Sequence, residues 1–225
     1  ATGRMYVSAL PFAEKLKIRL PIISYNGSYV CDPINDKVIF HKSIPEKIVK
    51  EIILETEKAG LHLNLYYKDN FFVEERNKGV EIYENIAGVK GKTIGSLSKN
   101  FQGDSTKMLI IEKDKEKKEY YLNYFKEKYG DKLEITESKN IFIEFMAKGV
   151  SKGKALTELA KSLELSQDKT IAIGDGFNDL EMLKWAGLGI AMQNAPKGVK
   201  EHADLIADYH NKDGAAKILK KIFEL

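Results

Sequence analysis

The sequence predicts an α/β protein with a doubly wound, Rossmann-like parallel sheet built from both ends of the chain and an α+β domain inserted between them. The C-terminal third alternates short apolar strands with helices, as a parallel sheet covered on both faces requires. The middle of the chain instead places several strands in close succession, which is typical of an antiparallel sheet. The first residues return to the alternating pattern of the C-terminal third.

The N-terminal part begins with a loose helical stripe of apolar residues, followed by a short buried strand at 20–25. The strand stops at Asn26-Gly27, a dipeptide that strongly favours a turn. Another strand is expected at 38–40. A helix then begins near Pro45 and ends near Gly60, because proline suits the first turn of a helix and glycine its end.

The middle of the chain reads as a largely antiparallel sheet with helices covering one face. Its predicted strands are 61–67, 71–75, 107–111, 133–136 and 141–146, and its predicted helices are 80–87 and 115–128. Aromatic residues at strand spacing usually pack within a sheet. We therefore expect Tyr66, Tyr67, Phe71 and Phe72 to be core residues, with a pocket lining as the alternative.

After Gly149 the sequence alternates helix and strand. Helices are predicted at 152–163, 178–185 and 214–223, and strands at 170–173 and 189–192. Short apolar strands separated by helices indicate a parallel sheet with both faces covered.

Composition excludes several classes of protein. Hydrophobic residues make up 43% of the 225 positions and charged residues 31%, which is ordinary for a globular protein. A net charge of +3 is too balanced for non-specific nucleic-acid binding. The single cysteine, Cys31, cannot form an intramolecular disulfide, and no run reaches the roughly 18 apolar residues of a membrane helix. We expect a cytoplasmic protein that binds neither nucleic acid nor membranes.

The stretch from Gly174 to Asp179, Gly-Asp-Gly-Phe-Asn-Asp, is the most informative motif. It places Asp175, Asn178 and Asp179 just after an apolar strand, at the strand end where open α/β sheets bind ligands. Hard oxygen ligands at this position suit Mg²⁺. The alternative is that Asp175 and Asp179 merely cap the next helix, since carboxylates are favoured at helix N-termini.

Two common phosphate-binding motifs fail. Residues 149–155, Gly-Val-Ser-Lys-Gly-Lys-Ala, look superficially like a P-loop, but the glycine spacing is too short and Ala155 replaces the Ser/Thr ligand of Mg²⁺. No Gly-x-Gly-x-x-Gly follows a strand. Lys152 and Lys154 stand at a helix start, where positive charge is unfavourable, so an anionic partner is worth seeking; for Lys154 we favour a solvated surface position.

Five motifs occur in the order expected for the haloacid dehalogenase (HAD) superfamily. They are Ala1-Thr-Gly-Arg4, Asn26-Gly27, Lys152-Gly-Lys-Ala-Leu156, Gly174-Asp-Gly-Phe-Asn-Asp179 and Asn194-Ala195. The chain closely resembles the Cof-type sugar-phosphatase branch over essentially its whole length. The resemblance implies an HAD core made of residues 1–43 and 148–225, with residues 44–147 as the inserted cap domain.

The resemblance also implies the roles of the catalytic residues. Thr2 supplies a hydroxyl that binds the transferring phosphoryl group, and Lys152 is the cation that neutralises it. Asp175 is a Mg²⁺ ligand, and Asn178 and Asp179 orient the metal, its waters and Lys152. A cation and a metal of this kind stabilise the charge of a phosphoryl transition state.

Further substrate-binding residues follow from the same resemblance. Gly3 and Arg4 belong to the segment that binds the phosphate, together with Thr2, Lys152 and Asn178. Asn26 and Gly27 match a loop that approaches the phosphate or the substrate. For Arg4, a salt bridge on the helix surface is at least as good an interpretation.

Family members begin with a strand ending in Asp-x-Asp-Gly-Thr, whose first Asp attacks phosphorus, and this sequence contains no such motif. We expect a strand and helix that carry it to precede Ala1 in the intact protein, and the 225-residue chain alone to be inactive. The predicted function is Mg²⁺-dependent hydrolysis of small phosphate monoesters through an aspartyl-phosphate intermediate. The alternatives are a non-catalytic phosphometabolite-binding protein, and a phosphomutase or phosphotransferase of the same superfamily.

Overall fold

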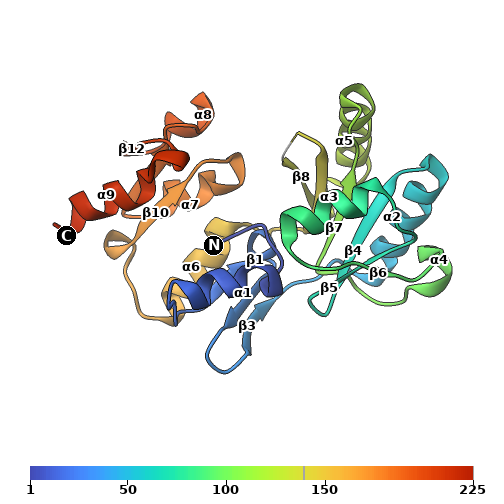
Figure 1. The fold of residues 1–225 in the computed structure, drawn as a ribbon, viewed down its shortest axis with the longest axis horizontal. Coiled ribbons are helices and arrows are strands. Elements are labelled where there is room, and N and C mark those ends of the chain that lie inside the picture. The colour runs from blue at the N-terminus through green and yellow to red at the C-terminus, as the bar shows by residue number, and fades with distance from the viewer. Residues whose placement is uncertain (139, 225) are drawn as a thin grey trace. The chain divides into compact units, whose positions relative to one another are not determined.

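The structure is a computed structural model that describes residues 1–138 and 140–224. The chain forms two compact units, Ala1–Val150 and Ser151–Leu225, coloured blue to yellow and yellow to red in Figure 1. Residues 1–43 thus share a compact unit with residues 44–147. The division into a core of 1–43 and 148–225 and a cap of 44–147 stays a prediction.

Within the described residues, the first unit contains a six-stranded sheet with the order β6-β5-β4-β7-β9-β8. Its strands are β4 (His62–Tyr67), β5 (Asn70–Val73), β6 (Lys92–Thr93), β7 (Lys107–Ile111), β8 (Leu133–Ser138) and β9 (Phe142–Ala147). All neighbours pair antiparallel except β5 and β6. The predicted, largely antiparallel sheet is therefore confirmed.

Helices cover both faces of this sheet, whereas the sequence predicted helices on one face. Leu63, Met108 and Phe145 share one core with α2 (Glu46–Ala59), α4 (Leu97–Asn100) and α5 (Lys115–Tyr129). The alternate positions, Leu109 and Phe142, share another core with α1 (Tyr6–Lys15) and α3 (Lys78–Ala87). Because the central strands are apolar on both faces, both need a covering layer.

The N-terminal residues form a separate antiparallel sheet of β1 (Ile22–Ser24), β2 (Tyr29–Asp32) and β3 (Lys37–His41). The predicted strand at 20–25 is thus shorter, and its last residue enters the 3₁₀ turn Tyr25–Gly27. This turn brings the chain back along β1, so β1 pairs with β2 in an antiparallel hairpin.

The second unit contains the parallel sheet, in the order β10-β11-β12. Its strands are β10 (Ile171–Gly174), β11 (Leu188–Met192) and β12 (Leu205–Ala207), and its helices are α6 (Lys152–Ser162), α7 (Leu180–Trp185), α8 (Lys197–Lys200) and α9 (Gly214–Phe223). Ala172 and Ala191 face a core shared with α7 and α8, and Ile190 faces one shared with α9. The predicted parallel sheet with helices on both faces is confirmed. The sequence did not predict β12, because a strand of three residues is too short to show a periodic pattern.

Candidate active site

A buried ion pair lies at the start of α6. The ammonium of Lys152 is 2.6 Å from Oδ1 of Asp179, and both side chains are 8% exposed. Lys152 is the first residue of α6, where Ser151 caps the helix by accepting a hydrogen bond from the backbone N–H of Lys154. The aspartate thus provides the anionic partner that a lysine at a helix N-terminus needs. Lys154 is exposed, as expected.

The second oxygen of Asp179 organises the turn after β10. Oδ2 accepts hydrogen bonds of 3.0 Å from the backbone N–H groups of Asp175 and Gly176. Gly176 precedes the 3₁₀ turn Phe177–Asp179, so the carboxylate of Asp179 binds a backbone N–H at the start of a helical turn. To that extent Asp179 is a capping residue, as the alternative interpretation predicted. The same carboxylate also binds Lys152, so capping is not its whole role.

Gly174 gives Asp179 the space to reach these partners. A Cβ on Gly174 would lie 2.5 Å from Cβ of Asp179 and 2.8 Å from its Cγ, closer than side-chain atoms can approach. The first glycine of the motif is therefore required by the close packing of the strand end against the aspartate.

Asp175 lies at the carboxyl end of β10 and is exposed, as is Asn178. Its Oδ2 accepts a 2.9 Å hydrogen bond from Nδ2 of Asn194, which follows the neighbouring strand β11. Among residues 1–138 and 140–224, no three His, Cys, Asp or Glu side chains come together as a metal site. A single exposed carboxylate still fits Mg²⁺, which usually takes one or two protein carboxylates and completes its shell with water and phosphate.

The other predicted site residues lie in the first unit, where backbone hydrogen bonds join residues 2–4 to residues 23–26. The N–H of Thr2 donates to the carbonyl of Ile23 (2.8 Å), and that of Asn26 donates to the carbonyl of Thr2 (3.0 Å). The N–H of Tyr25 donates to the carbonyl of Arg4 (2.8 Å). The structure therefore brings together Thr2, Gly3, Arg4, Asn26 and Gly27, which the sequence analysis had placed in two separate motifs.

The turn at Asn26 has an unusual backbone. Tyr25, Asn26 and Gly27 all have positive φ, at 51°, 55° and 101°. A residue other than glycine in this region costs about 1–3 kcal/mol, and such strain is concentrated at functional sites. Tyr25 is buried, and its hydroxyl stabilises the turn by donating a 2.7 Å hydrogen bond to Oδ1 of Asp69. Burial, reinforced by the neighbouring Asp69, raises the pKa of Tyr25 well above its ordinary value, which keeps the donor protonated.

The guanidinium of Arg4 is held at the end of α3. Its Nη1 donates to the backbone carbonyl of Ile86 (2.7 Å) and to Oγ of Ser8 (3.0 Å), and its Cζ lies 5.3 Å from the ring centroid of Phe12. These contacts replace the carboxylate partner that a surface salt bridge would require. Nη1 therefore anchors residues 2–4 to the end of α3.

Sequence reasoning missed two charged residues beside this turn. Lys107 and Glu144 are 2% and 6% exposed, and the Lys107 ammonium is 3.1 Å from Oε2 of Glu144. The same oxygen accepts a 2.6 Å hydrogen bond from Nδ2 of Asn26, and Lys107 also donates to the carbonyl of Gly3 (3.4 Å). The available signal was a single glutamate inside the apolar run 142–147.

The electrostatics of Glu144 favour its charged form. Burial alone would raise the pKa of this carboxyl group. The ammonium of Lys107 and the hydrogen bonds from Ser138 and Asn26 outweigh burial and hold the pKa below its ordinary value. Glu144 is therefore an anion at neutral pH, and it is paired.

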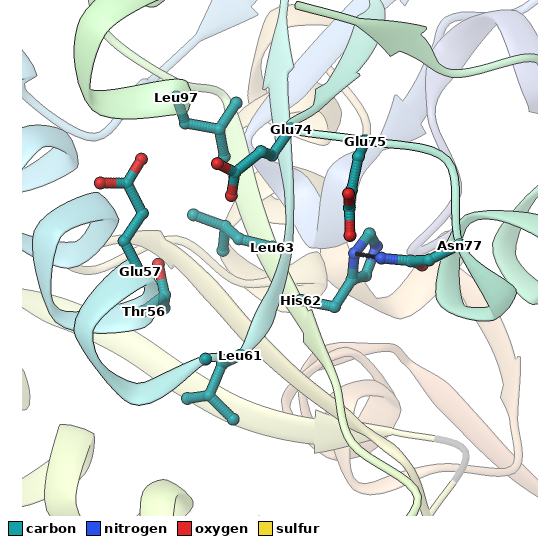
Figure 2. Close-up of a pocket in the computed structure, with 10 residues that line it drawn as sticks. Thr56, Glu57, Leu61, His62, Leu63, Glu74, Glu75, Asn77 and Leu97 are labelled. Atoms are coloured by element: carbon teal, nitrogen blue, oxygen red, sulfur yellow. Dashed lines mark hydrogen bonds between the residues drawn. The ribbon is translucent and has the colours of Figure 1, made fainter. Parts of the chain in front are cut away.

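The first unit contains at least two pockets. One, of about 490 Å³, is lined by Tyr25 and Tyr67 among others. Tyr66 and Phe71 are core residues as expected, and Tyr67 and Phe72 are partly buried against the core, so Tyr67 both packs on the core and lines the pocket. A second pocket, of about 230 Å³, is shown in Figure 2, where Glu57, Glu74 and His62 point toward it. Its lining contains none of the predicted site residues.

Comparisons with known proteins agree with this geometry. A sequence model of the haloacid dehalogenase-like hydrolases matches residues 1–219. Two phosphatases of Bacillus subtilis that act on 5-amino-6-(5-phospho-D-ribitylamino)uracil, YitU and YcsE, are similar to the chain. YitU is 28% identical over 237 residues, covering 100% of this chain and 84% of YitU. YcsE is 31% identical over 224 residues, covering 98% of this chain and 79% of YcsE.

A solved structure shows the same fold. The HAD subclass IIB sugar phosphatase BT4131 superimposes with a TM-score of 0.83 at 26% identity, covering 100% of this chain and 85% of that one. The predicted fold class, an α/β core with a parallel sheet and an α+β cap, is thereby confirmed. No helix in the part of the chain that the structure describes has the length and apolar character needed to cross a membrane.

Proposed function

The chain belongs to the haloacid dehalogenase-like hydrolase family and is a phosphatase of it, and we propose that it hydrolyses small phosphate monoesters of sugars or similar metabolites with Mg²⁺ as cofactor. The observation that supports this most directly is the buried Lys152–Asp179 ion pair beside the exposed Asp175. A buried cation at the strand end of a parallel sheet is suited to an anionic ligand.

The residues of the second unit have distinct roles in this proposal. The ammonium of Lys152 neutralises charge on the phosphoryl oxygens while the phosphoryl group is transferred. Asp179 fixes the position of that ammonium. Asp175, supported by Asn178, would hold Mg²⁺, which when bound supplies further positive charge to the phosphoryl group.

The residues of the first unit bind the substrate. The hydroxyl of Thr2 is the proposed hydrogen-bonding group for the phosphoryl oxygens, and it accepts a 3.1 Å hydrogen bond from the N–H of Arg4. Because a hydroxyl both donates and accepts, this bond leaves its proton available to a phosphate oxygen. Gly3 lies next to Thr2, and the buried turn of Asn26 and Gly27 supports this segment through the hydrogen bond from the N–H of Asn26 to the carbonyl of Thr2.

An aspartyl-phosphate intermediate is the finer part of the proposal. It requires a nucleophilic carboxylate, and the sequence contains no Asp-x-Asp-Gly-Thr motif. Rapid acid quenching during turnover, followed by intact-mass measurement, tests whether one phosphoryl group becomes attached to the protein. Turnover without such a species would exclude the covalent route and leave direct attack by water.

The substrate class is tested by phosphate release from a panel of sugar phosphates and phosphorylated sugar alcohols, including the substrate of YitU and YcsE. We expect release to require Mg²⁺ and to be lost in Lys152→Met but kept in Lys154→Met. Saturable binding of these compounds without release would support the non-catalytic alternative. A transfer of phosphate to a second sugar in place of release would support the mutase or phosphotransferase alternative. We further propose that the enzyme works in the cytoplasm.

A further inference from the structure

We propose that Glu144, with Lys107 as its counterion, is a positioning residue that holds the two substrate-binding segments, residues 2–4 and 25–27, in one arrangement through the side chain of Asn26. This inference rests on the proposed function of those segments. It goes beyond that function because it assigns a role to a buried ion pair on the inserted sheet.

Both carboxylate oxygens of Glu144 have hydrogen-bond partners. Oε2 of Glu144 accepts from Asn26 and from Lys107, while Oε1 accepts a 2.6 Å hydrogen bond from Oγ of Ser138. Charges this deeply buried are tolerated only when hydrogen bonds satisfy them. Two hydrogen bonds join the pair to the substrate-binding segments: Asn26 donates one to Glu144, and Lys107 donates one to the carbonyl of Gly3.

The pair also stands on a rigid support. Lys107 begins β7 and Glu144 lies in β9, two strands that are neighbours in the middle of the six-stranded sheet and buried along their whole length. Glu144 pairs with Leu109, so Lys107, two residues from Leu109, projects from the same face. Sites on central strands are held more precisely than sites on loops.

Stability alone does not explain such a pair. Apolar residues of similar size are usually as stabilising as a buried ion pair, or more so. What they could not provide is an acceptor for the amide of Asn26, a residue in the strained part of the turn. Its Oδ1 lies only 2.8 Å from where a Cβ of Gly3 would stand, so a change in its orientation would disturb the other segment as well.

Two double variants separate the hydrogen bond from the charge. Lys107→Met with Glu144→Gln removes both charges but keeps an acceptor for Asn26, whereas Lys107→Met with Glu144→Leu removes the acceptor too. We expect the first to keep the KM of the full-length wild-type enzyme for a phosphate monoester within about threefold. We expect the second to raise KM about tenfold or more with a smaller change in kcat, because the binding surface is displaced.

A matched control excludes a general effect of destabilisation. Glu84→Gln removes another buried carboxylate, which binds Arg76 and Lys90 and no substrate-binding residue. It should lower the melting temperature and leave KM unchanged. In an Asn26→Ala background, where KM is already raised, Glu144→Leu should raise it no further, because its effect passes through Asn26.

The same KM in the Gln and Leu variants, or full additivity with Asn26→Ala, would overturn the inference while leaving the proposed function intact. If the wild type neither turns over nor binds phosphate monoesters, the proposed function fails instead. The positioning contact is then tested by NMR, through slow exchange of the Asn26 side-chain amide protons. Slow exchange in the wild type and the Gln variant but not in the Leu variant supports it; equal exchange in all three overturns it.

Discussion

Lys152 and Lys154 differ by two positions in the sequence but have opposite environments. The side chain of Lys154 is exposed, whereas that of Lys152 is buried against Asp179. Removing one partner of a buried pair costs about 3–5 kcal/mol, since the other charge is left unpaired. The difference arises because Lys152 is paired with a residue from a later helix start.

We therefore predict that Lys152→Met lowers the free energy of unfolding by about 3–5 kcal/mol, whereas Lys154→Met changes it by less than about 0.5 kcal/mol. Denaturant unfolding measures both. Lys152→Met combined with Asp179→Asn should recover most of the lost stability, because an amide oxygen can still accept from the N–H groups of Asp175 and Gly176, without recovering phosphate release. Recovery of both would show that the pair has no part in binding phosphate.

Substitution of Asp175 should affect activity strongly and stability little. Because the side chain of Asp175 is exposed and accepts a hydrogen bond from the amide of Asn194, which an asparagine oxygen can also accept, Asp175→Asn should change the free energy of unfolding by less than about 0.5 kcal/mol. It should nevertheless abolish Mg²⁺-dependent phosphate release and weaken Mg²⁺ binding measured by calorimetry. Asp168→Asn, another exposed aspartate, is the control. Full activity in Asp175→Asn would exclude Asp175 as a metal ligand.

Glu144 predicts a pH dependence of stability. Burial opposes its charge, but Lys107 and two hydrogen bonds leave its folded-state pKa below the ordinary value of about 4.3. The stabilisation is therefore fully present above about pH 4.3 and is lost as the pH falls through the folded pKa. The Lys107→Met, Glu144→Gln variant should show a shallower loss of unfolding free energy in that acidic range. Parallel curves for the two proteins would contradict the charged, paired state of Glu144.

At the scale of elements, the start of α6 couples helix stability to the site. Ser151 and Asp114 are both helix N-caps, of α6 and of α5, and each accepts a hydrogen bond from a backbone N–H three residues later. Replacing either with alanine should cost about 1 kcal/mol. Because Lys152 is the first residue of α6, Ser151→Ala alone should also reduce kcat/KM for phosphate release. Equal activity in the two variants would show that fraying of α6 does not reach Lys152.

At the scale of the whole molecule, the strands of both units differ in how deeply they are buried. Central strands β7 and β9 are buried at every residue, whereas two of the three residues of β12 are exposed, as are all five of β3. Amide hydrogen exchange should therefore be slowest in β7 and β9 and fastest in β3 and β12. Protection of β3 or β12 comparable to that of β7 would contradict this ranking.

The sequence by itself determined the features that depend on local pattern. Alternating apolar residues located β4, β7 and β9, and the strand-turn-helix pattern around Gly174 located β10, Asp175 and Asp179. These succeeded because side-chain periodicity and turn chemistry act over a few residues. The Asn26-Gly27 turn was located for the same reason.

Only the tertiary structure decided which of these residues meet. Nothing local to Lys107 or Glu144 indicates that they pair with each other, or that the pair reaches Asn26 and Gly3, which lie more than a hundred residues away from Glu144 in the sequence. The burial of Lys152 against Asp179 was equally out of reach of a pattern. The physical reason is that burial and ion pairing depend on the packing of distant elements, whereas a periodic pattern records only which face of its own element a residue occupies.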